Sequence, residues 1–128
     1  WRIGVQNPFA AGSIASINLR GDHNMFTSGN YQRYYQQDNR RVHHIIDPRS
    51  GAPSLKLSSA TVLTSDPVLA DVAATTLMIG GAENHRKLAQ SLGIYDYMIV
   101  SEDRKIIISR SFADKVSLTS DWPVTVVD

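Results

Sequence analysis

An aspartate and a threonine lie four residues apart in the middle of the chain, at Asp71 and Thr75. In a helix this spacing places both side chains on one face. A carboxylate and a hydroxyl are hard oxygen ligands, and Mg²⁺ usually takes only one or two protein ligands beside water and substrate phosphate. The alternative is an ordinary helix in which Asp71 is exposed and Thr75 bonds to its own backbone.

Two adjacent histidines, His43 and His44, precede a turn sequence Asp-Pro-Arg-Ser-Gly at residues 47–51. In a strand these histidines face opposite ways, so one can point to a site while the other packs or meets solvent. A histidine can act as a general base near neutral pH, although a single strand histidine is more often structural. Asp47 either orients a histidine or caps the turn.

Ser28 and Gly29 form a third candidate, because glycine lets the backbone approach a ligand closely. The same dipeptide is also common in simple turns. Tyr31, Tyr34 and Tyr35 follow at a spacing that fits a helix or a short strand, and they can stack on a ring or pack in a core. The G-x-G-x-x-G pattern and the P-loop are absent, so general motifs do not indicate nucleotide binding.

Length and composition indicate one globular domain. The chain has 128 residues, of which 42% are hydrophobic, so it can bury a core. Thirteen basic and 12 acidic residues leave a net charge of +1, and no basic excess exists to bind nucleic acid. The absence of cysteine excludes disulfides, thiolate metal sites and a cysteine nucleophile. No apolar run has the length of a membrane span, and no targeting signal is present.

Strands are predicted wherever apolar and polar residues alternate or β-branched residues gather. Three of them, at residues 1–6, 13–20 and 23–27, could form a meander. The others are residues 40–46, 55–64, 95–101, 105–110 and 123–127, and the pair 95–101 and 105–110 forms a plausible hairpin.

Helices are predicted on both sides of a glycine pair. Residues 65–67, Ser-Asp-Pro, provide a cap and a first-turn proline for a helix over residues 68–79. The glycines at 80–81 end it, and a second helix covers about residues 83–91. The first helix is apolar nearly all round, which predicts burial, and a buried Asp71 would need a cation or an arginine as partner. The whole predicts an α+β fold, an antiparallel-rich sheet with a helical hairpin.

Three segments in this order resemble the ApbE-type FAD:protein FMN transferases. They are Thr-Ser-Gly-Asn-Tyr at 27–31, His-Ile-Ile-Asp-Pro-Arg-Ser-Gly-Ala-Pro at 44–53 and Ala-Asp-Val-Ala-Ala-Thr-Thr-Leu-Met at 70–78. Residues 1–8 also look like the start of the family's second half, and Ser50 stands where threonine is commoner. The resemblance implies a T-fold-like (ApbE-like) architecture. It also implies that residues 1–128 are either a single domain or the C-terminal portion of an ApbE-like flavin transferase domain whose N-terminal half is absent from this chain.

The resemblance implies that such a protein binds FAD as substrate, cleaves its pyrophosphate with Mg²⁺ and transfers FMN to a threonine or serine hydroxyl of a target flavoprotein, releasing AMP. By motif, Asp71 and Thr75 would bind Mg²⁺, and His44 would be the general base for the acceptor hydroxyl. Ser28 and Gly29 would border the flavin.

Asp47 would support the His44 loop beside the cofactor. The implied partners are FAD, a target flavoprotein subunit of a membrane redox complex, and a second chain that could carry the missing N-terminal half. No nucleic-acid partner is expected. The family resemblance places such proteins in the periplasm or at the cell surface. The alternatives are an FAD pyrophosphatase that releases FMN and AMP, and a non-catalytic flavin-binding or structural fragment of the family.

Overall fold

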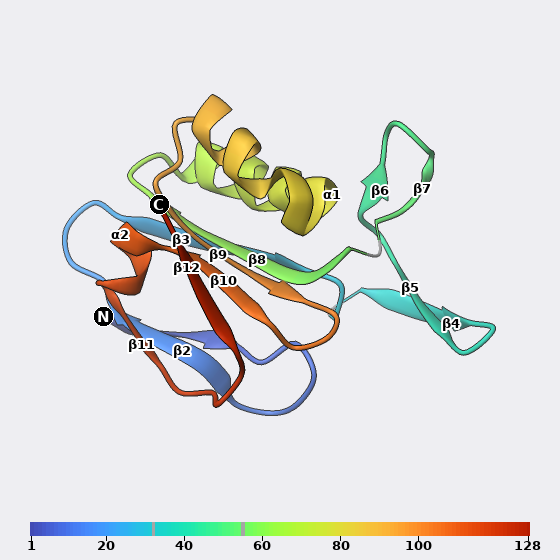
Figure 1. The fold of residues 1–128 in the computed structure, drawn as a ribbon, viewed down its shortest axis with the longest axis horizontal. Coiled ribbons are helices and arrows are strands. Elements are labelled where there is room, and N and C mark those ends of the chain that lie inside the picture. The colour runs from blue at the N-terminus through green and yellow to red at the C-terminus, as the bar shows by residue number, and fades with distance from the viewer. Residues whose placement is uncertain (32, 55) are drawn as a thin grey trace.

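A five-stranded sheet forms the centre of the structure, a computed structural model that describes residues 1–31, 33–54 and 56–128 (Figure 1). Its strand order is β12-β10-β9-β8-β3. Strands β10 and β12 are parallel, and the other neighbours are antiparallel. The strands are β3 (Asn24–Gly29), β8 (Leu57–Thr64), β9 (Asp96–Ser101), β10 (Ile106–Ser109) and β12 (Val124–Val127). The predicted α+β class and the predicted hairpin of β9 and β10 are confirmed.

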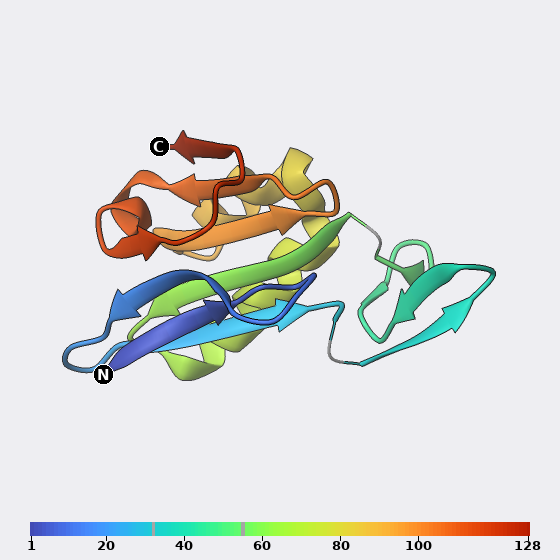
Figure 2. The ribbon, with the colours of Figure 1, turned by 90° about the horizontal axis from the view of Figure 1, so that it is seen from below.

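A second, three-stranded sheet covers one face of the central sheet (Figure 2). Its order is β1-β2-β11, with β1 at Arg2–Gln6, β2 at Ser13–Asn18 and β11 at Val116–Leu118. The predicted meander of the first three strands is therefore wrong, because β3 leaves β2 and pairs with β8. The physical reason is burial. Strand β8 is buried along almost its whole length, so it needs hydrogen-bonding neighbours on both edges, and β3 and β9 supply them.

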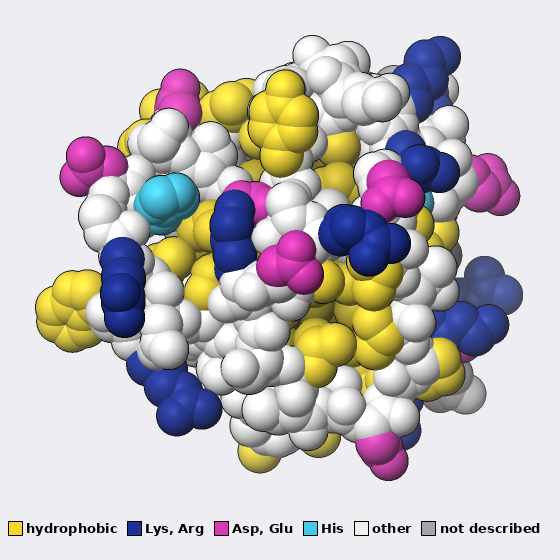
Figure 3. All heavy atoms as spheres, turned by 60° about the vertical axis from the view of Figure 1, so that its left-hand side comes forward, with side chains coloured by type: hydrophobic (Ala, Val, Ile, Leu, Met, Phe, Trp, Pro, Cys, Tyr) yellow, Lys and Arg dark blue, Asp and Glu magenta, His cyan; other side chains and the backbone are white. Residues whose placement is uncertain are grey.

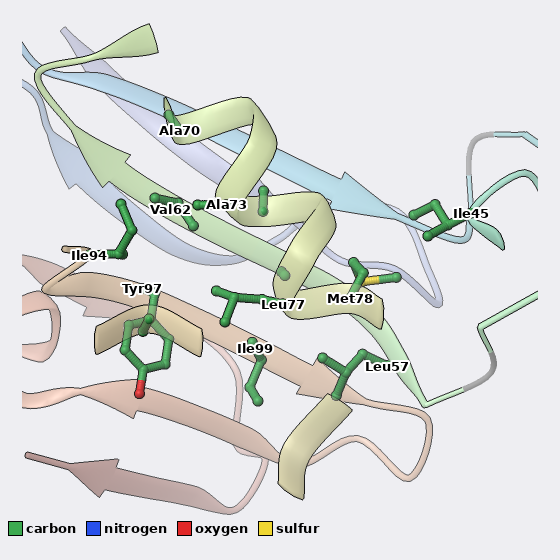
Figure 4. Packing of buried hydrophobic residues seen from close by; sticks show 13 residues of the cluster. Ile45, Leu57, Val62, Ala70, Ala73, Leu77, Met78, Ile94, Tyr97 and Ile99 are labelled. Carbon is green, nitrogen blue, oxygen red and sulfur yellow. The ribbon is translucent and has the colours of Figure 1, made fainter. Parts of the chain in front are cut away.

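Helix α1 (Pro67–Ser91) covers the other face of the central sheet (Figure 4). Its small side chains Ala70, Ala73 and Ala74 allow close approach to the sheet, and Leu77 and Met78 complete the buried face. The expectation of burial on nearly all sides is wrong. Because the sheet covers only one side of the helix, Val68 is 71% exposed and both Val72 and Asp71 are exposed.

The two ends of the first helical half follow the predicted signals. The Asp66 carboxylate accepts hydrogen bonds from the amides of Val68 (2.9 Å) and Leu69 (3.1 Å), which caps the helix N-terminus. At Gly81 the backbone takes φ 73° and ψ −176°, and the chain turns back in the second half of α1 (Figure 1). The second half packs on the first through Leu88, which lies against Gly80. The predicted helical hairpin is confirmed.

We expect Gly81→Ala to lower the free energy of unfolding by about 1–3 kcal/mol, because its φ and ψ lie in a region that is essentially restricted to glycine. A Cβ there would also lie 2.6 Å from Cδ and 3.0 Å from Cβ of Lys56. Urea denaturation measures the change. Gly93→Ala is the matched control, since Gly93 has φ 68° but an added Cβ would meet no neighbour within 4 Å. An equal loss in both variants would show that the Lys56 contact contributes nothing.

Two small hairpins project from the body, on the far side from the chain termini (Figures 1 and 2). The first pairs β4 (Tyr34–Gln37) with β5 (Arg40–His43), and the second pairs β6 (Ile46–Asp47) with β7 (Ala52–Pro53). The predicted strand 40–46 is therefore too long, because the backbone leaves the strand conformation at His44. The break at His44 separates the β4–β5 hairpin from the β6–β7 hairpin, whereas the sequence pattern predicted one continuous strand through both.

Most other predicted boundaries differ from the observed ones by a residue or two. Strand 13–20 ends at Asn18, and strand 23–27 is shifted to Asn24–Gly29. Strand 105–110 ends at Ser109, because Arg110 begins the short helix α2 (Arg110–Ala113). Leu55, the predicted first residue of strand 55–64, lies outside the described residues.

Charged side chains are distributed without a single-sign patch on the face shown in Figure 3, where basic and acidic groups alternate among apolar and neutral ones. This distribution agrees with the nearly balanced net charge of +1. Among the described residues, no helix combines the length and the apolar character that crossing a membrane requires.

Candidate functional site

A polar pocket of about 380 Å³ opens between the end of β3, the first half of α1 and the segment that joins β5 to β6. It brings together Ser28, Gly29, His44, Asp71 and Thr75, which the sequence places in three separate segments. The remaining lining residues are Thr27, Arg33, Ile45, Ile46 and Ile79. Every predicted site residue except Asp47 therefore lines one pocket.

Hydroxyl groups connect the strand wall of this pocket to its helix wall. The Oγ of Ser28 lies 3.1 Å from the Oγ1 of Thr75, and Thr75 also donates to the backbone carbonyl of Asp71 (3.3 Å). Because Thr75 has a single hydroxyl hydrogen, donation to that carbonyl leaves Ser28 as the donor between the two hydroxyls. The hydroxyl of Thr27, the preceding residue, pairs instead with that of Thr61 on β8 (2.9 Å).

The donors on α1 suit a hard cation. The Asp71 side chain is exposed at the pocket, and the Thr75 hydroxyl lies one helical turn further along the same face. Among the described residues, no group of three or more His, Cys, Asp or Glu side chains could enclose a metal ion. A carboxylate and a hydroxyl on one helix face are hard oxygen donors of the kind that Mg²⁺ takes together with waters and substrate phosphates.

His44 is aimed into the pocket by the burial of its two neighbours. His43 and Ile45 are both buried, and Ile45 belongs to the core beneath α1 (Figure 4). The carbonyl of Ile45 accepts a hydrogen bond from the amide of Ser54 (2.9 Å), and the Ser54 hydroxyl donates to the carbonyl of Met78 on α1 (2.9 Å). With both flanking residues held in the core, the exposed His44 side chain points away from the core and lines the pocket.

The hydrogen bond of His44 decides which ring nitrogen can act as a base. Its Nδ1 lies 3.4 Å from the backbone carbonyl of Arg33. A carbonyl can only accept, so Nδ1 carries the hydrogen in this contact, and Nε2 keeps its lone pair. The geometry thus leaves one nitrogen of His44 able to accept a proton from a group in the pocket.

His43 has the opposite environment. Burial lowers the pKa of its imidazole, while the nearby Ser54 backbone raises the pKa to a smaller extent. Its Nδ1 accepts a hydrogen bond from the amide of Ile45 (3.3 Å), so this nitrogen carries no hydrogen in the contact. Of the two adjacent histidines, one packs and the other faces the site, which is one of the arrangements that the strand pattern allows.

Asp47 caps the turn that follows the His44 segment. Its Oδ1 accepts from the backbone amide and the Nε of Arg49 (both 2.9 Å), and its Oδ2 accepts from Nη2 (2.7 Å). Its carbonyl accepts from the amides of Ser50 (3.2 Å) and Gly51 (2.8 Å). The carboxylate faces Arg49 and does not line the pocket. Asp47 therefore shapes the turn between β6 and β7, and its side chain bonds to Arg49 rather than to His44.

We expect the Asp47 carboxyl group to titrate at about pH 2. Hydrogen bonds from the Arg49 side chain, then from its amide, lower the pKa of Asp47 from its usual range to about 2. Because the folded-state pKa is depressed, the turn is fully stabilised above about pH 4 and loses this contribution as the pH falls towards 2. An NMR titration of the carboxyl carbon measures the midpoint. A midpoint near 4 would contradict the bidentate pair, and Arg49→Gln should move the midpoint upward.

Gly29 has a packing role that the sequence did not indicate. A Cβ at this position would collide with the ring of Tyr31, so the ring occupies the space that a side chain would need. Burial also raises the pKa of the Tyr31 hydroxyl. Arg33 is a site residue that the sequence did not indicate: it lines the pocket, and its carbonyl is bonded to His44. No motif includes Arg33, and its closeness to Ser28 in the sequence is the one available signal.

Comparison with known proteins shows the family to which the chain belongs. Residues 1–99 match the model of the ApbE family. The chain belongs to the ApbE family. Over the whole chain it is 34% identical to a Rhodobacter capsulatus protein named FAD:protein FMN transferase, and over 85% of the chain it is 38% identical to a Klebsiella pneumoniae protein of the same name. The sequence resemblance is thereby confirmed.

Solved ApbE structures have the same fold. The ApbE protein from Thermotoga maritima superposes on 90% of the chain with a TM-score of 0.81 and 32% identity. The flavin transferase ApbE from Vibrio cholerae covers the same share with a TM-score of 0.71 and 33% identity. The chain spans only 25% and 35% of the two ApbE relatives above, and 38% and 37% of these two structures.

Proposed function

We propose that this chain carries the metal-binding and general-base residues of an FAD:protein FMN transferase. The observation that supports the proposal is the single pocket in which Ser28, His44, Asp71 and Thr75 meet. The relatives are named FAD:protein FMN transferase, which supports FAD as the donor and a protein as the acceptor. Because the chain spans only 35% of one such relative and 38% of a solved ApbE structure, the proposal concerns the part of the site that this chain contributes.

In this proposal Asp71 and Thr75 hold Mg²⁺ beside the pyrophosphate of FAD. When bound, the ion offsets the negative charge on the phosphate oxygens and makes AMP a better leaving group. Ser28 keeps Thr75 in place through the bond between their hydroxyls. Because Thr75 donates its hydrogen to the Asp71 carbonyl, a lone pair on its oxygen would be available to a cation.

His44 accepts the proton of the attacking hydroxyl at Nε2. The oxygen of the acceptor threonine or serine forms a bond to the phosphorus of the FMN moiety, and the P–O bond to AMP breaks. The bonding electrons leave with the AMP phosphate. The Arg33 carbonyl bonded at Nδ1 orients the ring and stabilises the imidazolium that forms.

Water is the competing acceptor, because the His44 side chain is exposed to solvent. Hydrolysis of FAD to FMN and AMP is therefore the second candidate activity, and it needs the same base and the same cation. We further propose that the natural acceptor is a flavoprotein subunit of a membrane redox complex, in the periplasm or at the cell surface, as the family resemblance implies.

The test is to incubate the protein with FAD, Mg²⁺ and a threonine-bearing acceptor peptide, and to measure AMP and flavinylated peptide separately. We expect both products in equal amounts. AMP without labelled peptide would favour the hydrolase, and the absence of both would leave a non-catalytic fragment of the family. EDTA should remove both products together, since the oxygen donors alone cannot offset the pyrophosphate charge.

A further inference from the structure

His44 stands at the border between the polar pocket and a second pocket of about 550 Å³. The two pockets share Arg33, His44 and Ile46 as lining residues. The second pocket extends away from α1, along the projecting hairpin of β4 and β5, and is closed on its other side by Gly51 and Pro53. The His44 side chain is therefore accessible from both pockets.

A third pocket continues the second one along the same hairpin. It has a volume of about 670 Å³ and shares Tyr35, Val42 and Pro53 with its neighbour. It reaches Arg40 and the Asp38 turn at the tip of the hairpin. Shared lining residues connect the three pockets in a series from Asp71, past His44, to the end of β4, and we call this series the track. A row of open pockets along a hairpin can accommodate an extended polypeptide.

The chemistry of the track changes at His44. On the α1 side its walls carry the Asp71 carboxylate and the hydroxyls of Ser28 and Thr75. The walls of the second pocket are mainly apolar, with Tyr35 62% exposed and Ile46 45% exposed, whereas the third pocket adds the polar residues Gln37, Asp38 and Arg40. Exposed apolar side chains that line one pocket together can serve as a binding surface.

The hairpin side carries two arginines, Arg33 and Arg40, and one acidic residue, Asp38, so positive charge is in slight excess there. Both arginines are exposed, and neither forms an ion pair among the described residues. The β4–β5 sheet pairs with no other strand in the described part of the chain, so its position depends little on the body. An acceptor segment with a carboxylate near its reactive hydroxyl would match the hairpin side in charge.

We propose that the track on the β4–β5 hairpin binds the acceptor protein, as an extended segment that carries apolar residues and a carboxylate around its reactive threonine or serine. This inference rests on the proposed transferase function. FAD occupies the side of Asp71 and Thr75, and the acceptor segment lies on the side of Tyr35 and Arg40. The acceptor hydroxyl then meets His44 at the point that the two pockets share, loses its proton there and displaces AMP.

The direct test is peptide binding, which needs no catalysis. The probe is a short synthetic peptide with a central threonine, flanking alanine and leucine residues and one aspartate, added to isotope-labelled protein. We expect the amide signals that shift to lie in residues 33–37, 40–44 and 51–53. Shifts confined to other segments, or no shift at millimolar peptide, would overturn the inference.

Variants separate this surface from the catalytic groups. We expect Tyr35→Ala to weaken peptide binding about tenfold, because aromatic residues in a pocket contribute most to such interfaces. Arg40→Gln removes only an exposed charge and should weaken binding about threefold. The control is Tyr95→Ala, an exposed tyrosine in a pocket between α1 and α2, which should leave peptide binding unchanged.

Activity measurements separate peptide binding on the hairpin from the transferase activity itself. With active protein, Tyr35→Ala should lower transfer to the peptide by a larger factor than it lowers AMP release. Equal peptide binding by Tyr35→Ala and the unsubstituted protein would overturn the docking surface even if transfer occurs. Peptide binding on the hairpin without AMP or labelled peptide would support the surface and contradict the transferase activity of this chain.

Discussion

Replacing Asp71 by alanine is expected to lower Mg²⁺-dependent FAD cleavage by roughly a thousandfold. A bound metal contributes several kcal/mol of charge stabilisation in phosphoryl transfer, and each 1.4 kcal/mol is a factor of about ten in rate. Asp71 is the one carboxylate among the described residues that line the polar pocket. Its loss leaves only hydroxyl and carbonyl oxygens, which bind a divalent cation weakly.

The fold should survive this substitution. Asp71 is exposed on α1, and alanine is the best helix former, so the free energy of unfolding should stay the same or rise slightly. Rates of AMP release at several Mg²⁺ concentrations and a urea melt test both expectations. The matched control is Asp103→Ala, because Asp103 lies in the exposed β9–β10 turn and forms an ion pair with Lys105 (2.9 Å). Near-normal turnover in Asp71→Ala would contradict the metal role.

Replacing His44 by alanine should lower the rate of FMN transfer by about a hundredfold to ten-thousandfold, which is the usual contribution of a positioned general base. Binding of FAD should change much less. The ring is exposed, and its hydrogen bond to the Arg33 carbonyl is long at 3.4 Å. Single-turnover transfer and fluorescence titration with FAD measure the two quantities separately.

His23→Ala is the control for this experiment, since His23 is an exposed histidine that also bonds to a backbone carbonyl through Nδ1 (3.0 Å to Arg20). It should leave both quantities unchanged. Equal loss of binding and transfer in His44→Ala would identify His44 as a structural residue. His43→Ala should instead destabilise the protein, because it removes a buried ring and its bond to the Ile45 amide.

Local spacing was sufficient to predict the parts of the site that lie within one element. The four-residue step from Asp71 to Thr75 follows from helix geometry, and the sequence also predicted a cap at Ser65 or Asp66, of which the structure uses Asp66. The outward direction of His44 was left open by the strand pattern, since either histidine could have faced the site. Burial of Ile45 in the core decides the choice, and that burial depends on α1, a separate element that begins only at Pro67.

Contacts between elements could not be predicted in this way. The bond from Ser28 to Thr75 requires β3 to lie beside β8 and under α1, and no local signal in residues 24–29 identifies the partner strand. The meander prediction failed for the same reason, because turn residues near Gly21 are compatible with pairing to β2 or with departure to another sheet. Which strands pair depends on which apolar faces of the sheets must still be buried.

The position of β11 has a consequence for the way the chain folds. This strand joins β2 although the two are far apart in the sequence, and Thr119 bonds to the carbonyls of Ser13 (2.8 Å) and Ile14 (2.8 Å). Most partners of the apolar face of β1 and β2 lie on β9, β10 and α2, in the last third of the chain, although Leu63 on β8 and Met25 on β3 also take part. During synthesis most of this face therefore stays exposed until that region has left the ribosome. Non-local pairing of this kind slows folding and prolongs the time in which chaperones can bind the nascent chain.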